Sequence, residues 1–210
     1  MSGTTSGNDR RQHWDDVYAR RSSTEVSWFQ AHPAWSLRAI EAAGLDARSA
    51  IIDIGGGAST LIDELIGRGF EDLTVLDVSA NVLAQVADRL GAAASRVQFI
   101  RSDVTQFRPA RTYSLWHDRA VFHFLTRPNE REAYRLALRS GTAPGSHAVI
   151  ATFGPQGPTR CSGLDTSRYD APALARELGA EFELIDSLLD VHTTPGGVQQ
   201  QFLHTRFRRV

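Results

Sequence analysis

The stretch that decides the fold is Ile51-Ile52-Asp53-Ile54-Gly55-Gly56-Gly57-Ala58-Ser59. Its first half has the apolar character of a buried parallel strand, and three glycines follow at once. A helical pattern over Thr60–Arg68 begins directly after the turn. Glycines let the backbone approach a ligand closely, and a helix N-terminus offers free N–H groups to an anion. The stretch therefore predicts a ligand site at the carboxyl end of this strand.

Strands and helices alternate from this stretch onward. Five short apolar runs are predicted as strands: Ala50–Ile54, Leu73–Leu76, Val97–Ile100, Tyr113–Trp116 and Ala148–Phe153. Helical spacing falls between them, at Val82, Leu83, Val86 and Leu90 and again over Glu130–Arg139. Strands that alternate with helices indicate a parallel sheet with helices on both faces.

The C-terminal end breaks this alternation. Phe182–Val191 and Val198–Phe207 both have strand character, and Thr194-Pro195-Gly196-Gly197 joins them as a hairpin. We therefore expect an α/β, Rossmann-like, mostly parallel seven-stranded sheet with helices on both faces and a C-terminal antiparallel hairpin. A dinucleotide-binding dehydrogenase more often continues its β-α-β units to the end. Its G-x-G-x-x-G fingerprint also fails here, because the last position is Thr60.

Two helical segments precede the sheet, one over His13–Arg21 and one after Pro33. A chain of 210 residues is long enough for one domain with a buried core. We therefore divide the chain into a disordered polar tail over residues 1–12, an N-terminal helical cap or lid over 13–47, and the ligand-binding domain over 48–210.

Acidic residues follow two further strands. Asp77 ends the strand Leu73–Leu76, and Asp103 comes shortly after Val97–Ile100. A carboxylate at the tip of the second strand can accept hydrogen bonds from both hydroxyls of a ribose. Asp77 could instead cap the next helix, although Ser79 is better placed for that task. Acids at successive strand ends, beside a glycine turn, indicate a nucleotide-type ligand.

At these residues the chain resembles the class I S-adenosylmethionine-dependent methyltransferases, from about His13 to the C-terminus. Within that superfamily it is most similar to the group that contains the elongation-factor lysine methyltransferases. The segments that carry this similarity are Trp14-Asp15-Asp16-Val17-Tyr18, Trp28-Phe29, Gly57-Ala58-Ser59-Thr60-Leu61, Gly69-Phe70 and Leu76-Asp77-Val78-Ser79.

The resemblance implies S-adenosyl-L-methionine as the cofactor, with Asp103 accepting the adenine amino group. The implied cofactor-binding residues are Trp14, Tyr18, Trp28, Asp53, Gly55, Gly57, Asp77, Val78, Asp103, Val104, Asp118 and Arg119. Trp14 and Tyr18 share one helix face, so packing that helix onto the sheet is an alternative role for them. As a hypothesis, the segment around Trp28 folds over the cofactor as a lid whose aromatic faces meet the sulfonium.

Two departures from the family pattern limit what can be carried over. Ser59 replaces the third glycine of the turn, and Arg119 follows Asp118 where the group carries a lysine after its acid. Arginine does not give up its proton, so Arg119 can contact the cofactor but cannot accept a proton. Asp118 and Arg119 could also pair with each other on the pocket floor.

Methyl transfer from a sulfonium needs alignment first, and a base only if the acceptor arrives protonated. His117 is the first candidate base, because it ends a central strand and imidazole titrates near neutrality. Hydrogen bonding to a neighbouring loop is its alternative role, and His123 is the second candidate. Cys161 lies in the loop after the fifth strand, where acceptors are often contacted. The seven histidines show no metal-ligand spacing, so no metal site is predicted.

Composition narrows the class of partner. The formal net charge is −1, so no basic field is expected to attract nucleic acid or a membrane, and no apolar run is long enough to cross one. The single cysteine fits a cytoplasmic protein. We expect methyl transfer to a small molecule, with a protein lysine as the alternative acceptor. A nicotinamide-dependent oxidoreductase and a module that only binds the cofactor are further alternatives. The oligomeric state is not predicted.

Overall fold

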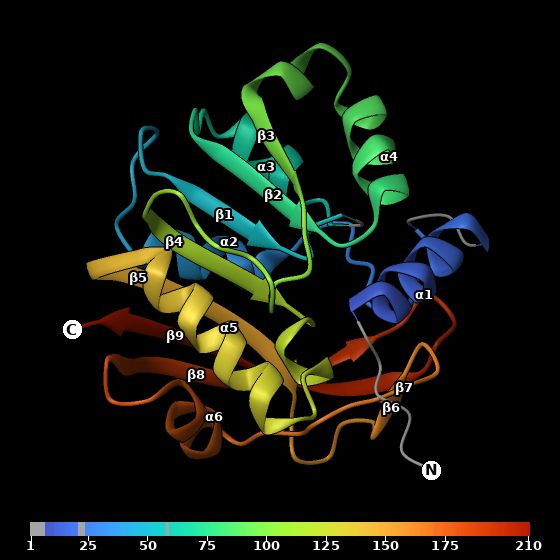
Figure 1. Ribbon diagram of the computed structural model, residues 1–210, viewed down its shortest axis with the longest axis vertical. Helices are drawn as coiled ribbons and strands as arrows, with labels where there is room; N and C mark the ends of the chain where they lie inside the picture. The colour runs from blue at the N-terminus through green and yellow to red at the C-terminus, as the bar shows by residue number, and fades with distance from the viewer. Residues whose placement is uncertain (1–6, 21–23, 58) are drawn as a thin grey trace.

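The structure is a computed structural model that describes residues 7–20, 24–57 and 59–210. Seven strands form one sheet in the order β3-β2-β1-β4-β5-β9-β8 (Figure 1). Their bounds are Ile51–Ile54 (β1), Leu73–Asp77 (β2), Val97–Arg101 (β3), Tyr113–Arg119 (β4), Thr142–Phe153 (β5), Phe182–Thr193 (β8) and Gln199–Arg209 (β9). The pairs among β1 to β5 are parallel, and β9 runs antiparallel to both β5 and β8. The predicted parallel sheet with a C-terminal hairpin is confirmed.

Helices cover both faces of this sheet, as predicted. The helices are Gly7–Arg20 (α1), Ala34–Ala42 (α2), Leu61–Gly67 (α3), Ala80–Leu90 (α4), Pro128–Ser140 (α5) and Ala171–Leu178 (α6), with 3-10 turns at Gly91–Arg96 and Phe122–Phe124. On one face, residues of α2, α3 and α4 join a core cluster with β1, β2 and β5. On the other, α5 and α6 join a second cluster around the indole of Trp116. The buried strands therefore need apolar residues on both sides, which is why β1 and β2 are buried throughout.

The alternation of side chains along β1 and β4 decides which residues can meet. Ile51 and Leu115 pack into the cluster on the α2 and α3 face, whereas Ile52 and Trp116 pack into the cluster on the α5 face. Because successive side chains of a strand point to opposite faces, Asp53 follows Ile51 toward the α2 face. The pleat of these two strands thus determines the surroundings of every polar residue that they carry.

The N-terminal segment differs from the prediction. Residues 7–12 belong to α1 instead of a disordered tail, while residues 1–6 and 21 lie outside the described part of the chain. Arg10 anchors this helix through ion pairs with Asp103 (2.7 Å) and Glu130 (2.6 Å). The polar composition of this segment predicted disorder. Its ordering partners lie about a hundred residues further along the sequence, so no local pattern reveals them. In Figure 1, α1 lies beside the end of the sheet where β1 and β2 finish.

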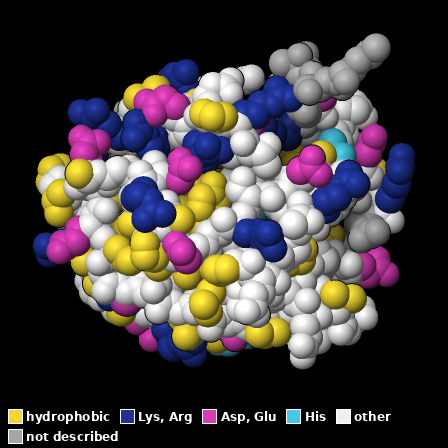
Figure 2. Space-filling view, turned by 90° about the horizontal axis from the view of Figure 1, so that it is seen from below, with side chains coloured by type: hydrophobic (Ala, Val, Ile, Leu, Met, Phe, Trp, Pro, Cys, Tyr) yellow, Lys and Arg dark blue, Asp and Glu magenta, His cyan; other side chains and the backbone are white. Residues whose placement is uncertain are grey.

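The two edge strands of the sheet are β3 and β8, and β8 carries several exposed apolar side chains. Its exposed apolar side chains include Ile185, Leu188, Leu189 and Val191. Figure 2 views the molecule from this side and shows hydrophobic side chains interspersed with basic and acidic ones, so neither sign of charge dominates the face. A two-stranded hairpin that was not predicted, Arg160–Cys161 (β6) with Leu164–Asp165 (β7), follows β5. No helix in the described residues is long and apolar enough to span a membrane.

Candidate active site

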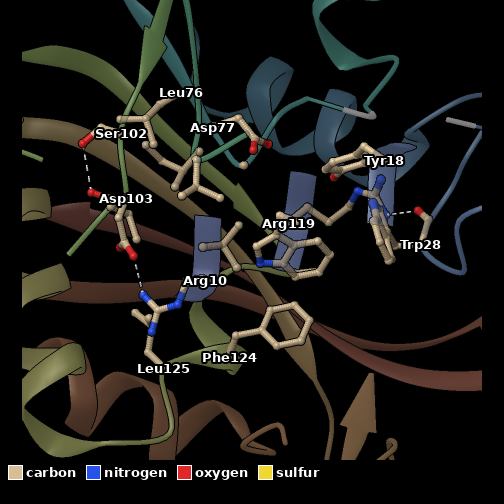
Figure 3. Close-up of a pocket in the computed structure, with 17 residues that line it drawn as sticks. Arg10, Tyr18, Trp28, Leu76, Asp77, Ser102, Asp103, Arg119, Phe124 and Leu125 are labelled. Carbon is tan, nitrogen blue, oxygen red and sulfur yellow. Dashed lines mark hydrogen bonds and ion pairs between the residues drawn. The ribbon is translucent and has the colours of Figure 1, made fainter. Parts of the chain in front are cut away.

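A pocket lies at the carboxyl ends of the parallel strands, next to α1 (Figure 3). Nine of the predicted cofactor-binding residues line it: Trp14, Tyr18, Trp28, Gly55, Asp77, Val78, Asp103, Val104 and Arg119. Eight further lining residues were not predicted: Arg10, Ile54, Leu76, Ser102, Ala120, Val121, Phe124 and Leu125. The predicted set could be read from strand ends and from the family resemblance. The additional set is placed by α1 and by loops, whose course only the fold determines.

Asp77 is held rigidly at the end of β2. Its Oδ1 accepts from the backbone N–H of Ser79 (2.9 Å), and its Oδ2 accepts a longer bond from the N–H of Gly57 (3.3 Å). Burial raises the pKa of Asp77 to about 6, against the opposing effect of these hydrogen bonds. The cap of α4 is Ser79, whose hydroxyl accepts from the N–H of Val82. Asp77 is therefore available for the two hydroxyls of a ribose.

Asp103 meets an unpredicted partner. Its Oδ1 accepts from the backbone N–H and the hydroxyl of Thr105 (2.9 and 2.8 Å), and its Oδ2 accepts from Nη1 of Arg10 (2.7 Å). Figure 3 shows the Arg10 guanidinium beside the carboxylate. An adenine amino group that bound to Oδ2 would compete with Arg10 for it.

Aromatic rings form one wall of the pocket. The ring of Trp14 meets the rings of Trp28 and Phe124 edge to face, at centroid distances of 5.6 and 5.3 Å. Tyr18 is buried and lies 6.1 Å from Trp14. These rings also contact Val82 of α4, so Trp14 and Tyr18 both pack their helix and line the pocket. The packing role is therefore confirmed, while contact with the cofactor stays a prediction that their place in the pocket lining allows.

Two polar atoms near the glycine turn lack partners among the described residues: Oδ2 of Asp53 and Nε of Arg119. Arg119 donates through Nη1 to the backbone carbonyl of Trp28 (2.6 Å). Burial lowers the pKa of Arg119 to about 10, and the negative charge of Asp53 offsets part of that effect. A buried acceptor and a buried cationic donor in one place are complementary to a zwitterion. The ammonium and carboxylate of an amino acid match this pair.

Two of the predicted residues point away from the pocket. His117 is 1% exposed, and both of its ring nitrogens are engaged on the α2 face. It cannot be the base that meets an acceptor in this pocket, and that prediction is wrong. Asp118 points to the other face, where it accepts from the hydroxyl of Tyr134 (2.7 Å) and the N–H of Val121 (2.9 Å). It neither lines the pocket nor pairs with Arg119.

The remaining predictions concern supporting residues. Asp53 and Gly57 do not line the pocket, although each is close to the glycine turn or to a lining residue: Oδ2 of Asp53 lies against Gly56, and Gly57 lies against Asp77. A Cβ at Gly57 would lie 2.8 Å from Oδ2 of Asp77 and closer still to Val82, so only glycine lets the turn pack there. His123 is fully buried and accepts from the N–H of Phe153 (3.2 Å), and burial lowers its pKa to about 3. It is neutral and does not line the pocket, which removes the second candidate base.

Comparison with known proteins decides the family. Residues 51–145 match the sequence model of the methyltransferase domain family. Residues 51–145, just under half of the chain, are therefore a methyltransferase domain. S-adenosylmethionine is the cofactor of this family, and the unpartnered atoms of Asp53 and Arg119 together with Asp77 are chemically compatible with that molecule.

Curated relatives and solved structures agree with this assignment. The methyltransferase domain is 23% identical over 128 residues to the eEF1A lysine and N-terminal methyltransferase of Mus musculus, a match that covers 60% of this chain and 18% of that protein. It is 23% identical over 94 residues to the protein of the same name from Bos taurus, covering 45% and 13%. The chain thus spans under a fifth of these relatives' length.

Two solved structures share the fold along the whole chain. The 1,6-didemethyltoxoflavin-N1-methyltransferase of Burkholderia thailandensis, solved with 1,6-didemethyltoxoflavin and S-adenosylhomocysteine, has a TM-score of 0.70 at 17% identity and covers 100% of this chain and 93% of its own. An S-adenosylmethionine-dependent methyltransferase of Anabaena variabilis has a TM-score of 0.73 at 15% identity and covers 96% and 95%. At these identities the likeness establishes the fold.

A second cleft lies on the other side of α1 in this methyltransferase domain. It is lined by His13, Asp16, Val17, Arg20, Ser27, Arg160, Cys161, Ser162, Gly163 and Gln200. Two buried atoms in it, Nε2 of His13 and Oε1 of Gln200, have no partner within the described ranges. Burial raises the pKa of the Cys161 thiol, which keeps it protonated. No group of three or more His, Cys, Asp or Glu side chains in the described residues could hold a metal.

Proposed function

We propose that this chain transfers the methyl group of S-adenosylmethionine to a small polar molecule. The observation that carries the proposal is the unpaired Oδ2 of Asp53 and Nε of Arg119 beside a pocket that ends in Asp77 and Asp103. From one end to the other, this order of groups matches an amino acid, a ribose and an adenine.

S-adenosylmethionine, when bound, would supply a methyl carbon on a positively charged sulfur, which the lone pair of an acceptor could take in line with release of the thioether. The chain's residues align and shield this reaction. Asp77 fixes the ribose, while Asp53 and Arg119 hold the amino-acid end. The rings of Trp14, Trp28 and Phe124 exclude water and present faces to the positive charge.

The side chains that line the pocket offer no general base that could remove a proton from the methyl acceptor. Its titratable lining residues are Arg10, Tyr18, Asp77, Asp103 and Arg119. Burial raises the pKa of Tyr18 well above its usual value, so the phenol stays protonated. Asp77 and Asp103 are committed to the nucleoside. The nucleophilic atom of the methyl acceptor must therefore arrive already deprotonated, or it must lose its proton to a group of the second cleft.

We place the acceptor in the second cleft. His13 and Trp14 are neighbours on α1 that line different cavities. Ser27 and Trp28 are neighbours beyond this helix that do the same, so the two cavities are adjacent. The unpaired Nε2 of His13 is available to take a proton. The lining carries Arg20 and Arg160 against the carboxylate of Asp16, and Arg160 also pairs with Asp165 (3.2 Å), so the cleft presents charges of both signs to a polar acceptor.

The acceptor class can be tested by incubating the protein with methyl-labelled cofactor and a cell extract that dialysis has freed of small molecules. The same reaction is run with the small-molecule fraction added back. We expect label in the small-molecule fraction. Label in the protein fraction would instead favour a lysine acceptor, as in the name of the curated relatives. The chain itself contains no lysine, so methyl-lysine recovered from the protein fraction must come from another protein.

Binding calorimetry separates the methyltransferase from the two alternatives, a nicotinamide-dependent oxidoreductase and a module that only binds the cofactor. Binding of S-adenosylhomocysteine but not NAD or NADP supports the proposal, and the reverse result would favour an oxidoreductase. Binding without transfer to any fraction of the extract would favour a module that only holds the cofactor.

A further inference from the structure

Three buried side chains form a hydrogen-bonded chain behind the cofactor pocket. Nδ1 of His117 lies 2.6 Å from Oδ1 of Asp53, and Nε2 of the same ring lies 2.8 Å from the hydroxyl of Ser36. The three residues are 1%, 1% and 3% exposed for His117, Asp53 and Ser36. They come from β4, β1 and α2, and none of them lines either cavity.

This arrangement fixes the imidazole at both ends. A carboxylate can only accept, so the proton of the shorter bond is on Nδ1 of His117. With Nε2 held by Ser36, the ring cannot turn, and Oδ1 of Asp53 is fixed in turn. The other oxygen of Asp53, Oδ2, is buried without a partner in the described part of the chain. Leaving a buried carboxylate oxygen unpaired is costly unless a ligand supplies the donor.

The unpaired oxygen lies against the glycine turn. A Cβ built on Gly56 would lie 2.4 Å from Oδ2 of Asp53, so the backbone of the turn packs directly on it. The charge of Asp53 also acts on Arg119, which lines the pocket. The turn is where the amino-acid end of the cofactor is expected, because its glycines let the backbone approach a ligand closely at the carboxyl end of β1.

We infer that His117, held by Ser36, is a positioning residue that aims the unpaired oxygen of Asp53 at the ammonium of the cofactor. The inference rests on the proposed function, because it needs S-adenosylmethionine in this pocket. It assigns a task to a histidine that does not touch the substrate. Through this contact Ser36 of α2 supports Asp53, which precedes the glycine turn.

Two ligands distinguish this role from a merely structural one. S-adenosylhomocysteine carries the amino-acid end, whereas 5′-methylthioadenosine has the same adenosine and thioether without it. In His117→Ala we expect the Kd of S-adenosylhomocysteine to rise about tenfold or more, as for loss of a hydrogen bond to a charged group. The Kd of 5′-methylthioadenosine should stay within about twofold of wild type, a difference too small to reflect a lost charged contact. His117→Asn places an amide N–H near the position of Nδ1 and should restore most of the affinity.

Ser36→Ala gives a second, milder variant and should show the same selectivity at reduced size. His123→Asn is the matched control, since it changes another fully buried histidine that lies outside this chain of contacts. We expect it to weaken neither ligand selectively, whatever it does to the melting temperature.

Equal weakening of both ligands in His117→Ala, or unchanged binding of both in that variant, would overturn the inference and leave the proposed function standing. Failure of the wild-type protein to bind S-adenosylhomocysteine would instead overturn the proposed function and the inference with it. If His117→Ala does not fold, the comparison of His117→Asn and Ser36→Ala with wild type decides, because both retain a polar or small side chain at the buried position.

Discussion

At the scale of single residues, the ionisation of Asp77 should control cofactor affinity. Burial raises its pKa to about 6. Ribose hydroxyls donate to the ionised form, so affinity should rise as the pH passes through about 6 and then level off. At pH 5 only about a tenth of a carboxyl with that pKa is ionised, so S-adenosylhomocysteine should bind about tenfold more weakly than at pH 8.

Calorimetry from pH 5 to 8 measures this step. Asp77→Asn should bind more weakly at every pH but without the step near pH 6. A variant that keeps the wild-type pH profile would assign the titration to another group.

A second residue-scale prediction concerns the glycine turn. In Gly56→Ala the new Cβ would lie 2.4 Å from Oδ2 and 2.6 Å from Cγ of Asp53, a contact that the buried carboxylate cannot avoid. We expect a loss of about 1–3 kcal/mol of unfolding free energy, as for other overpacked sites, together with weaker cofactor binding. Urea denaturation measures the first effect and calorimetry the second.

Gly67→Ala provides the matched control. Nothing lies within 4 Å of a Cβ built at Gly67, which ends α3. Alanine there should leave stability unchanged or raise it, because alanine is the better helix former. Similar losses in the two variants would show that the Asp53 contact is not the cause.

At the scale of elements, α1 combines two tasks that oppose each other. It contributes Trp14 and Tyr18 to the pocket, yet its Arg10 occupies Oδ2 of Asp103. The helix is thus anchored at the position where the adenine amino group is expected to bind. Cofactor binding and the anchoring of α1 should therefore be coupled.

Removing this anchor tests the competition. In Arg10→Gln we expect S-adenosylhomocysteine to bind about fivefold more tightly, because an ion pair of this kind is worth roughly 1 kcal/mol. Arg11→Gln, at the exposed neighbouring position, should leave affinity unchanged. Weaker binding in Arg10→Gln would show that the guanidinium moves to contact the bound nucleoside and does not compete with it.

At the scale of the whole molecule, buried titratable groups set opposing pH dependences of stability. Burial raises the pKa of Asp118 to about 6 and lowers that of His204 to about 4. Between about pH 4 and 6 the folded chain keeps a proton on Asp118 that the unfolded chain has lost, so this group makes stability fall as the pH rises. His204 stays neutral in the folded chain while the unfolded chain takes up a proton, so it makes stability rise with pH up to about 6.5.

Removing the carboxyl of Asp118 should make the opposite pH dependence that His204 contributes more visible in the unfolding free energy. In Asp118→Asn the falling contribution of this group is lost, so the unfolding free energy should rise more steeply between pH 4.5 and 6 than in wild type, by about 1–2 kcal/mol over that range. Urea denaturation at several pH values gives the slope, which is independent of any constant loss from the changed hydrogen bonds. Parallel curves for the two proteins would contradict the raised pKa.

Much of the fold was predictable because its signals are local. The run Ile51–Ile54 with its glycine turn, the alternation of strands and helices, and the turn before β9 all lie within short windows of sequence. The pocket residues at strand ends followed from the same rule, since parallel strands bring their carboxyl ends to one edge. Asp77 and Asp103 needed only their place after a strand.

The sequence by itself therefore determined the sheet, its hairpin and the strand-end residues that line the pocket. Only the tertiary structure decided which way His117 faces and what lies over Asp103. His117 ends a strand at the expected edge, but the pleat turns it toward α2, where Ser36 and Asp53 enclose it. Arg10 reaches Asp103 across 93 positions of sequence. Contacts of this kind depend on the packing of distant elements, which no local pattern of residues records.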